Sequence, residues 1–313
     1  MTISDSANKV PHVSVLYQQI INALRPKSPG LYVDATIGAG GHAQGILEQS
    51  APDGQLLGMD IDPQALELSL QRLRLYKNRI HLFHSSYTEL QRILQSLGWN
   101  LVNGIVIDLG VSSMQIDTPE RGFSFKNDGP LDMRFNPAQT ISASDIVNGY
   151  SEAELAELIW RYGEERESRR IARLIVQNRP FRSTNELANA ISSSLRSHPG
   201  AIHPATRTFQ ALRIAVNHEL EGLEIFLPQA VASLASGGRL AVISFHSLED
   251  RIVKQFFRRE SRDCVCPPGQ PVCNCGHKAS IIELTRHPIT ADPIEVAGNI
   301  RARSAKLRVV EKK

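Results

Sequence analysis

The stretch LYVDATIGAGGHAQGIL, residues 31–47, decides the fold class of this 313-residue chain. An apolar run ends at Asp34, a glycine-rich turn follows, and a helical pattern begins after the turn. Gly38, Gly40 and Ala43 satisfy a loose G-x-G-x-x-A, in which glycines let the backbone approach a ligand and present amide N–H groups to it. By itself this pattern fits a dinucleotide, S-adenosylmethionine or a tight turn without a ligand.

Short apolar runs alternate with amphipathic stretches on both sides of this turn. The runs expected to form strands are LYVDAT (31–36), QLLGMD (55–60), RIHLFH (79–84) and GIVIDLG (104–110), and later GGRLAVISF (237–245) and RARSAKLRVVEK (301–312). Between the first four, apolar residues recur at three- and four-residue spacings, which is typical of helices covering a sheet. The repetition of strand, helix and strand predicts a parallel, doubly wound α/β sheet.

The middle of the chain follows a different pattern. After Gly110 a Gly- and Pro-rich stretch predicts a long, functional loop, and three helical patterns with Ser or Thr caps follow it without an intervening strand. We therefore predict one α/β domain built from residues 1–114 and 205–313, interrupted by a loop and an all-helical insertion at residues 115–204. One long helix, residues 205–235, is expected to lead back into the sheet.

Charge is distributed unevenly along the chain. The formal net charge is +3, but residues 251–313 hold 13 Lys and Arg against 6 Asp and Glu, a balance of +7 that leaves −4 for residues 1–250. A basic end favours a phosphate-rich partner, because Lys and Arg displace counterions from nucleic acid; a solubilising tail is the alternative. No apolar stretch approaches the roughly 18 residues of a membrane span, and no signal peptide is evident, so we expect a cytoplasmic protein without a membrane partner.

All four cysteines lie within twelve residues, at Cys264, Cys266, Cys273 and Cys275, with His277 close behind. In a cytosolic chain such a cluster favours a metal over disulfides. The paired cysteines are separated by one residue rather than the two to four that structural zinc sites usually have. A structural zinc ion and free thiols in a polar loop therefore both remain open.

Acidic residues stand where the predicted strands end. Asp60 follows the glycines by some twenty residues, where a carboxylate would meet ribose hydroxyls, and Asp108 lies over the crevice in which open α/β sheets bind ligands. Asp62 is better explained as a helix N-cap before proline. Asp34 would either position the glycine turn or approach a ligand. Tyr87, just past the third strand, would cover an adenine ring or simply pack.

Several in-order motifs extend this pattern over nearly the whole chain: IGAGGH (37–42), MDIDPQAL (59–66), DLGVSSMQ (108–115), ERGFSF (120–125), GPLDMR (129–134), YGEER (162–166), HPATRTFQALRI (203–214) and ISFHSLEDRIVK (243–254). Together they resemble the bacterial 16S rRNA (cytosine-N4)-methyltransferase family, RsmH or MraW. The resemblance implies a Rossmann-like class I S-adenosylmethionine-dependent methyltransferase sheet with an inserted helical domain. It also implies methyl transfer from S-adenosylmethionine to the exocyclic amine of a cytidine in the decoding region of 16S rRNA, within the small ribosomal subunit.

The cofactor contacts that the resemblance implies fall on a short set of residues: Gly40, Gly41, His42, Asp60, Tyr87, Asp108 and Gln115. The usual motif that holds a target amine in amino-methyltransferases is replaced here by DLGVSS. The candidates for accepting the amine's hydrogen bond are therefore Asp108, Ser112 and Ser113, and no general base is assigned. Phe123 or Phe125 would stack on the cytosine or anchor the loop. His246 is better explained as a histidine holding a strand-to-helix turn than as a substrate contact.

Two other kinds of protein share parts of this pattern. A nicotinamide-dependent oxidoreductase would use the same glycine turn and Asp60, but the chain after Gly110 offers no recognisable hydride-transfer site. A non-catalytic RNA-binding factor would keep the fold as a platform, but it would not need intact cofactor-side residues. We therefore expect an enzyme.

Overall fold

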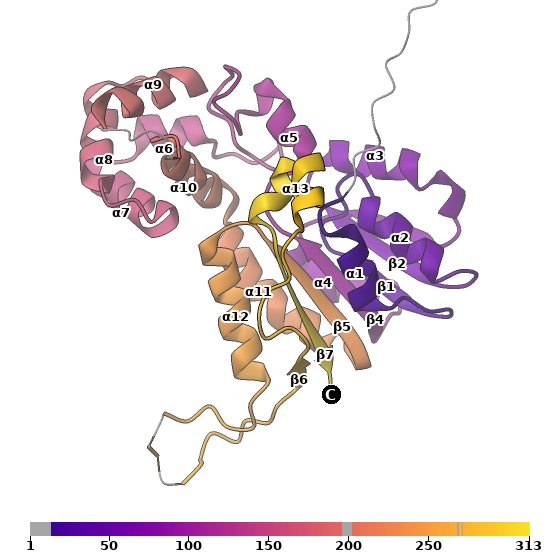
Figure 1. Ribbon diagram of the computed structural model, residues 1–313. Helices are drawn as coiled ribbons and strands as arrows, with labels where there is room; N and C mark the ends of the chain where they lie inside the picture. The colour runs from indigo at the N-terminus through magenta and orange to yellow at the C-terminus, as the bar shows by residue number, and fades with distance from the viewer. Residues whose placement is uncertain (1–13, 196–201, 268, 271) are drawn as a thin grey trace, which may run out of the picture. The chain divides into compact units, whose positions relative to one another are not determined.

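The structure is a computed structural model that describes residues 14–195, 202–267, 269, 270 and 272–313. The chain divides into two compact units (Figure 1). The first unit is built from residues 1–109 and 224–313, and the second from residues 110–223. Each unit is described by itself.

A seven-stranded sheet forms the centre of the first unit, in the order β3-β2-β1-β4-β5-β7-β6. Its strands are β1 (Leu31–Asp34), β2 (Gln55–Asp60), β3 (Ile80–His84), β4 (Val102–Asp108), β5 (Leu234–Ser244), β6 (Ile281–Glu283) and β7 (Lys306–Lys312). The first five strands are parallel, whereas β7 pairs antiparallel with both β5 and β6. The six expected strands are confirmed, and five of them form the predicted parallel sheet, whereas β7 is antiparallel and β6 was not expected.

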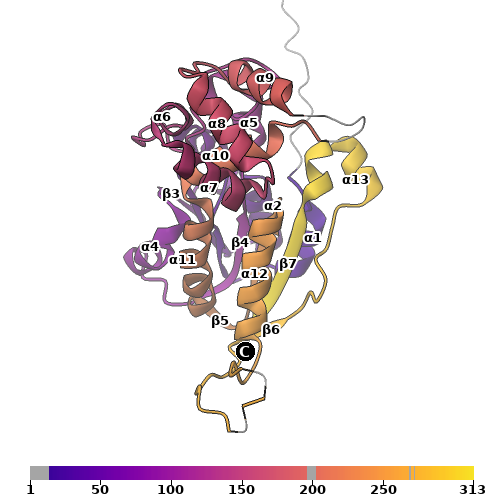
Figure 2. The ribbon, with the colours of Figure 1, turned by 90° about the vertical axis from the view of Figure 1, so that its left-hand side faces the viewer.

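Helices of the first unit bury apolar stripes against this sheet. They are α1 (Tyr17–Leu24), α2 (Gly41–Gln49), α3 (Pro63–Arg72), α4 (Leu90–Ser96) and α12 (Ser247–Glu260). The short helix α13 (Pro293–Gly298) has no buried residue and contacts the 3-10 helix that follows it. Fully buried side chains of α1 and α2, such as Ile20 and Ile46, pack in one core with Leu56 and Val106 of the sheet. The helix α12 runs beside β5 and β7 (Figure 2). Burial of these stripes, more than local propensity, stabilises the helices.

The second unit is helical. It contains α5 (Ser113–Asp117), α6 (Ala143–Gly149), α7 (Glu152–Gly163), α8 (Ser168–Gln177), α9 (Thr184–Ser194) and α10 (Thr206–Asn217), and α11 (Glu219–Ala232) begins in it. Ser142, Ser151 and Ser183 cap α6, α7 and α9, each in a reciprocal capping box with an acidic residue three positions later. The unit has its own apolar core, so it folds around contacts that the sheet does not provide.

The predicted long helix over residues 205–235 is wrong, because the chain breaks between α10 and α11. His218 adopts a left-handed conformation with φ of 51°, which ends α10. Across this break the guanidinium of Arg213 forms a bidentate ion pair with the buried carboxylate of Glu219, at 2.7 and 2.9 Å. Because α10 packs in the helical core, the second unit extends beyond the predicted insertion of residues 115–204 at both ends.

Within the described parts of the chain, no helix combines the length and the apolar character needed to span a bilayer.

Candidate functional site

Three carboxylates gather at one edge of the sheet in the first unit. Asp34, Asp60 and Asp108 are the last residues of β1, β2 and β4. These strands are neighbours and parallel, so their carboxyl ends share the edge at which open α/β sheets bind ligands. The structure thus brings together the acidic residues that the sequence pattern singled out.

The glycine turn follows β1 and is held by the carboxylate of β2. Gly38 and Gly40 have φ of 51° and 78°, conformations that a side chain would strain. The N–H of Gly38 donates to Oδ2 of Asp60 at 2.9 Å, and the N–H of Asp62 donates to Oδ1 of Asp60 at 2.9 Å. A carboxylate has about four acceptor positions, so Asp60 can still accept hydrogen bonds from a ligand.

The turn ends at the start of α2. The first N–H groups of a helix have no intrahelical acceptor, and here they belong to Gly41, His42 and Ala43. At Gly40 the positive φ favours glycine and a Cβ would also lie 3.1 Å from Leu73, whereas a Cβ on Gly41 would require Oγ of Ser14 to move. The backbone of this turn is therefore available to a polar or anionic ligand group.

The environment of the carboxylates opposes their ionisation. Burial raises the pKa of Asp34 to about 7, and the nearby charge of Asp60 adds to this, while amides of Thr36 and Ala43 oppose it. Burial likewise raises the pKa of Asp60 to about 6, against the hydrogen bonds from its backbone donors. Groups whose pKa values are displaced in this way cluster at functional sites, because a ligand can supply the missing partner.

Asp108 is the least satisfied member of the row. Its Oδ1 is buried and has no hydrogen-bond partner among the described residues. Burial raises its pKa well above the ordinary value, and the charges of Asp34 and Glu249 raise it further. Its backbone N–H donates to Oγ1 of Thr36 at 2.7 Å, which ties the ends of β1 and β4 together. An orphaned buried carboxylate oxygen fits a cationic or N–H-bearing ligand group.

Sequence reasoning missed Thr36 and Glu249 as members of this edge. Glu249 is buried, and its Oε2 accepts the N–H groups of Phe245 and His246, while Nδ1 of His246 accepts the N–H of Glu249. The interpretation of His246 as a residue holding a strand-to-helix turn is therefore confirmed. The separation of three residues between His246 and Glu249 is that of a capping box, and it was the signal that could have located Glu249.

Two aromatic candidates are held by the protein itself. The ring of His42 is buried, and its Nε2 lies 3.0 Å from the carbonyl oxygen of Val15. Burial lowers the pKa of His42 to about 4, so the ring is neutral at physiological pH. Any contact of His42 with a ligand is therefore expected from its backbone. Tyr87, the first residue of the 3-10 helix that follows β3, meets Phe226 edge-on with ring centroids 5.4 Å apart, and it is half-buried.

The remaining candidates belong to the second unit. Ser112 is the N-cap of α5, where its Oγ accepts the N–H of Gln115 at 3.2 Å and its own N–H donates to Oε1 of Gln115 at 2.9 Å. This reciprocal pair fixes the buried side chain of Gln115. Ser113 is the first residue of the same helix. The side chains of Ser112 and Gln115 thus have a structural role in addition to any ligand contact.

Phe123 and Phe125 pack against the helical core. Phe123 stacks on Phe135 with centroids 5.5 Å apart, and Phe125 meets His203 and Phe209 at 4.6 and 4.8 Å. Of the two alternatives left open by the sequence, these contacts favour anchoring of the loop over stacking on a base.

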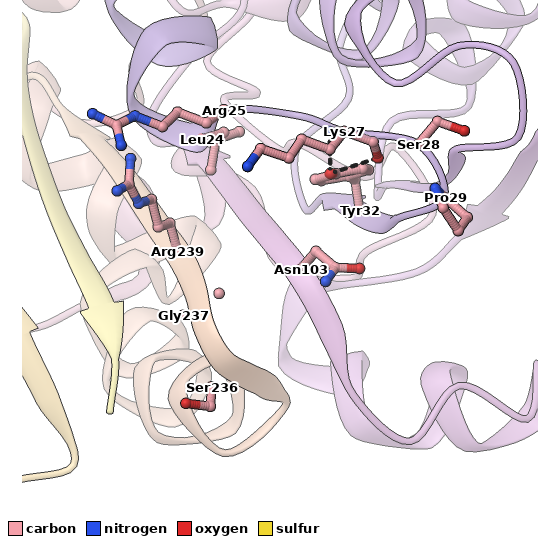
Figure 3. Close-up of a pocket in the computed structure, with 11 residues that line it drawn as sticks. Leu24, Arg25, Lys27, Ser28, Pro29, Tyr32, Asn103, Ser236, Gly237 and Arg239 are labelled. Atoms are coloured by element: carbon pink, nitrogen blue, oxygen red, sulfur yellow. Dashed lines mark hydrogen bonds between the residues drawn. The ribbon is translucent and has the colours of Figure 1, made fainter.

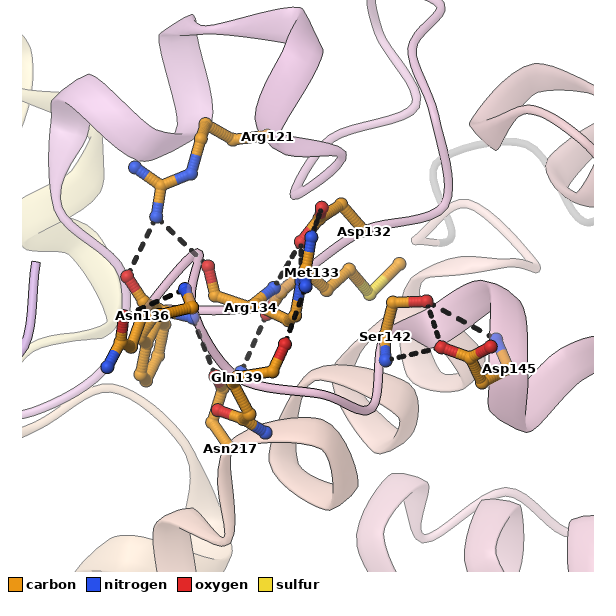
Figure 4. Close-up of polar contacts among 11 residues, drawn as sticks. Arg121, Asp132, Met133, Arg134, Asn136, Gln139, Ser142, Asp145 and Asn217 are labelled. Carbon is orange, nitrogen blue, oxygen red and sulfur yellow. Dashed lines mark hydrogen bonds and ion pairs between the residues drawn. The ribbon is translucent and has the colours of Figure 1, made fainter.

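Hydrogen bonds between side chains and the main chain order the loop between α5 and α6 (Figure 4). Nη2 of Arg121 donates to the carbonyl oxygens of Arg134 and Phe135, both at 2.9 Å. Asn217 of α10 donates to the carbonyl oxygen of Met133 at 2.8 Å and accepts the N–H of Phe135 at 2.7 Å. The motifs ERGFSF and GPLDMR therefore hold each other in place through the Arg121 side chain on the carbonyl of Arg134 and through the N–H of Met133, which donates to the carbonyl oxygen of Arg121 at 3.0 Å.

A cavity of about 380 Å³ lies at the other edge of the sheet (Figure 3). It is lined by residues near the amino ends of β1 and β4, including Tyr32 and Asn103, and by Arg25, Lys27 and Arg239. Arg239 is neutralised there by Glu311 at 2.8 Å. None of the predicted cofactor contacts lines this cavity, so it is separate from the carboxylate edge.

The first unit has the class I methyltransferase fold: a Rossmann-like sheet in the order β3-β2-β1-β4-β5-β7-β6 in which β7 is antiparallel to β5. The sequence model of the MraW methylase family matches residues 9–313, and the chain belongs to this family. Proteins named ribosomal RNA small subunit methyltransferase H are similar along nearly the whole chain. The one from Dehalococcoides mccartyi strain 195 is 52% identical over 96% of this chain and 86% of its own length. Those from Heliobacterium mobile and Thermomicrobium roseum are 48% and 50% identical over 96% of this chain and 98% and 93% of their own lengths.

Proposed function

We propose that this protein transfers a methyl group from S-adenosylmethionine to the exocyclic N4 amine of a cytidine in the decoding region of 16S rRNA. The observation that carries the proposal is the carboxylate row beside the glycine turn, in a chain that belongs to the MraW methylase family. Its relatives named ribosomal RNA small subunit methyltransferase H support the small ribosomal subunit as the partner and a cytoplasmic site of action.

The hydrogen-bonding and charged groups of the first unit match the chemical groups of S-adenosylmethionine. This cofactor offers a ribose diol, an α-ammonium group, a carboxylate and a cationic sulfonium. The free acceptor capacity of Asp60 suits the diol, and the backbone N–H groups of Gly41 and His42 suit the carboxylate. The N–H of Gly40 already donates to the carbonyl oxygen of Ile37 at 2.8 Å, so the proposed role of Gly40 is to let the ligand approach the backbone closely. Asp108, with its unpartnered buried oxygen, suits a cationic or N–H group. Tyr87 suits the adenine face. Gln115, which belongs to the second unit, stays a contact predicted from the sequence alone.

Methyl transfer to an aromatic amine depends chiefly on positioning. The cofactor supplies an electrophilic methyl group, and the amine must approach it in line from the opposite side. The lone pair of the amine is delocalised into the cytosine ring, and an acceptor on its N–H would localise it. We propose Asp108 as that acceptor ahead of Ser112 and Ser113, because the hydroxyl of Ser112 already caps α5. Once the nitrogen carries the methyl group its extra proton is acidic, so no strong general base is required.

We propose that one segment of the basic end of the chain, around residues 301–303, contacts rRNA phosphates. Arg308 and Lys306 form ion pairs with Asp250 at 2.6 and 3.6 Å, so they join β7 to α12 rather than face a partner. Arg303 is exposed in the short 3-10 helix between α13 and β7, which also contains Arg301. Arg303, as an exposed cation, is the better candidate for a phosphate contact, and we propose Arg301 with it from the charge of this segment.

Incubation of the protein with labelled S-adenosylmethionine and small ribosomal subunits tests this function. We expect label in 16S rRNA and, after digestion, in N4-methylated cytidine. Absence of label in rRNA, together with intact rRNA binding, would leave only the role of an RNA-binding factor. Calorimetric binding of NADH but not of S-adenosylmethionine would instead indicate an oxidoreductase.

A further inference from the structure

The loop between α12 and β6 is a separate feature of the first unit (Figure 2). Over its described residues, 261–267, 269, 270 and 272–280, it forms no helix or strand. It also lacks an apolar core, since Val265 and Val272 are 41% and 74% exposed. A loop of this length without regular structure needs another source of order.

Among the described residues, the hydrogen bonds that join the two arms without a cysteine lie near the base of the loop, apart from Gln270, which donates to Oδ1 of Asn274 at 2.9 Å. The N–H of Ser280 donates to the carbonyl oxygen of Glu260 at 2.9 Å, and the N–H of Ala279 donates to Oδ1 of Asp263 at 3.1 Å. Beyond these contacts the two arms carry the four cysteines, two on each arm. Order in the outer part of the loop therefore depends on what the cysteines do.

The four sulfur atoms converge although no disulfide joins them. All four Sγ atoms lie within 4.8 Å of one another. The Sγ distances are 3.9 Å for Cys266 and Cys273, 3.5 Å for Cys273 and Cys275, and 3.9 Å for Cys275 and Cys264. A disulfide requires about 2.05 Å. Four sulfurs placed tetrahedrally about 2.3 Å from a zinc ion are about 3.8 Å apart, so the observed spacing is that of a tetrahedral thiolate site.

We propose that Cys264, Cys266, Cys273 and Cys275 bind one Zn²⁺ ion and that this ion cross-links the outer part of the loop. His277 is outside the proposed ligand set, because the ligand atoms that lie within 4.8 Å of one another here are the four Sγ atoms; its Nε2 is hydrogen-bonded to the carbonyl oxygen of Arg259 at 3.0 Å. The N–H of Cys266 points to Sγ of Cys264 at 3.5 Å, a contact that stabilises a thiolate. Since all four positions are sulfur, no coordination position is left for a substrate, and the site is structural.

The charge of the loop suits such a site. Four thiolates and one Zn²⁺ carry a net charge of −2, and the exposed cations Arg259, Arg262 and Lys278 flank the cysteines in the sequence. The one-residue spacing within each pair, which departs from common zinc motifs, is compatible with the site because each pair lies on its own arm. The inference does not depend on the methyltransferase activity.

The zinc content of the full chain, purified under reducing conditions and dialysed, tests this proposal. We expect one zinc per chain in the unaltered protein and less than about one tenth as much in the double variant Cys273→Ser, Cys275→Ser. His277→Gln, which keeps a hydrogen-bond donor for the Arg259 carbonyl, should retain the full zinc content. Zinc-free protein with four titratable thiols, or two disulfides by mass, would overturn the proposal, as would equal zinc in the double variant.

Cobalt provides a second readout that does not rely on activity. Titration of metal-free protein with Co²⁺ should produce the visible and thiolate charge-transfer absorption of a tetrahedral four-sulfur site, saturating at one equivalent. Added Zn²⁺ should displace the bound Co²⁺ and abolish this absorption. Trypsin should cleave the metal-free chain at Arg262 and Lys278 faster than the zinc-loaded chain. An octahedral cobalt spectrum, or equal cleavage with and without zinc, would contradict the proposed cross-link.

Discussion

The backbone N–H of Gly38 donates to Oδ2 of Asp60 at 2.9 Å, so the carboxylate at the end of β2 holds the first glycine of the turn after β1. Two features that are 22 residues apart in the sequence are therefore one structural unit. Asp60 fixes the backbone of the turn through this hydrogen bond, and its carboxylate oxygens can accept further hydrogen bonds from a ligand. A change at Asp60 should affect the ligand and the turn together.

Asp60→Ala should weaken binding of S-adenosylmethionine by about 10- to 100-fold, because hydrogen bonds from a ribose diol to a carboxylate contribute roughly 1.5 to 3 kcal/mol. Isothermal titration calorimetry measures this directly. Glu67→Gln, which changes an exposed carboxylate on α3, serves as the matched control. An unchanged dissociation constant in Asp60→Ala would remove Asp60 from the cofactor site.

Asp34→Asn should stabilise the cofactor-free protein at pH 8. The pKa of Asp34 is raised from 3.8 to about 7 in the folded state. The protonated form therefore contributes stability that is full below about pH 4 and lost as the pH rises through 7. Asparagine does not ionise and still accepts the N–H of Thr36. The free energy of unfolding in urea should rise by about 1 to 4 kcal/mol at pH 8 and by less at pH 5. A loss of stability at pH 8 would show that the ionised carboxylate is held favourably.

Binding of S-adenosylmethionine should strengthen as the pH rises from about 5.5 to about 8. Asp60 and Asp34 have pKa values of about 6 and 7, and their ionised forms are the better acceptors for a cationic, hydrogen-bonding ligand. A bound cation would lower both pKa values, so proton release should accompany binding. Calorimetry in buffers of different ionisation enthalpy reports this release. An affinity independent of pH over this range would mean that neither carboxylate changes its protonation on binding.

Asp108→Asn separates the two roles proposed for this residue. The variant should fold, because it replaces a buried ionisable group by a neutral one of the same shape and its backbone N–H can still donate to Thr36. If Asp108 holds the target amine, the rate of methyl transfer should fall by about tenfold or more while the cofactor's dissociation constant stays within about twofold. Weaker cofactor binding at an unchanged rate would place Asp108 on the cofactor instead.

Charge reversal at Arg301 and Arg303 should weaken binding of 16S rRNA and flatten its salt dependence. Each lost phosphate contact should reduce the slope of log K against log salt by about 0.7 to 0.9. The double variant Lys77→Glu, Arg92→Glu makes the same change in net charge elsewhere on the first unit and should leave the slope unchanged. Equal slopes in all three proteins would make the basic end a solubilising tail.

The sheet could be predicted from sequence because each buried strand is a short apolar run between amphipathic stretches. The strand β6 could not, since it has three residues and depends on pairing with β7. The break at His218 was hidden because α10 and α11 both continue a helical pattern, and only the left-handed backbone and the Arg213–Glu219 ion pair reveal it.

The sequence predicts where the acidic residues of the candidate site lie, but not how deeply they are buried or which hydrogen-bond partners they have. The locations of Asp34, Asp60 and Asp108 follow from strand ends. The unpartnered oxygen of Asp108 depends on the burial that neighbouring strands create, which no local pattern reports. The partner of the His42 ring could not be predicted either, because the ring contacts the carbonyl of Val15, 27 residues earlier in the chain.

Mapping of modified nucleotides in 16S rRNA, from cells with and without this protein, tests the central claim most directly. The account predicts that one cytidine in the decoding region carries an N4-methyl group only when the protein is present, and that the Asp60→Ala variant fails to restore it. Identical methylation with and without the protein would contradict the account.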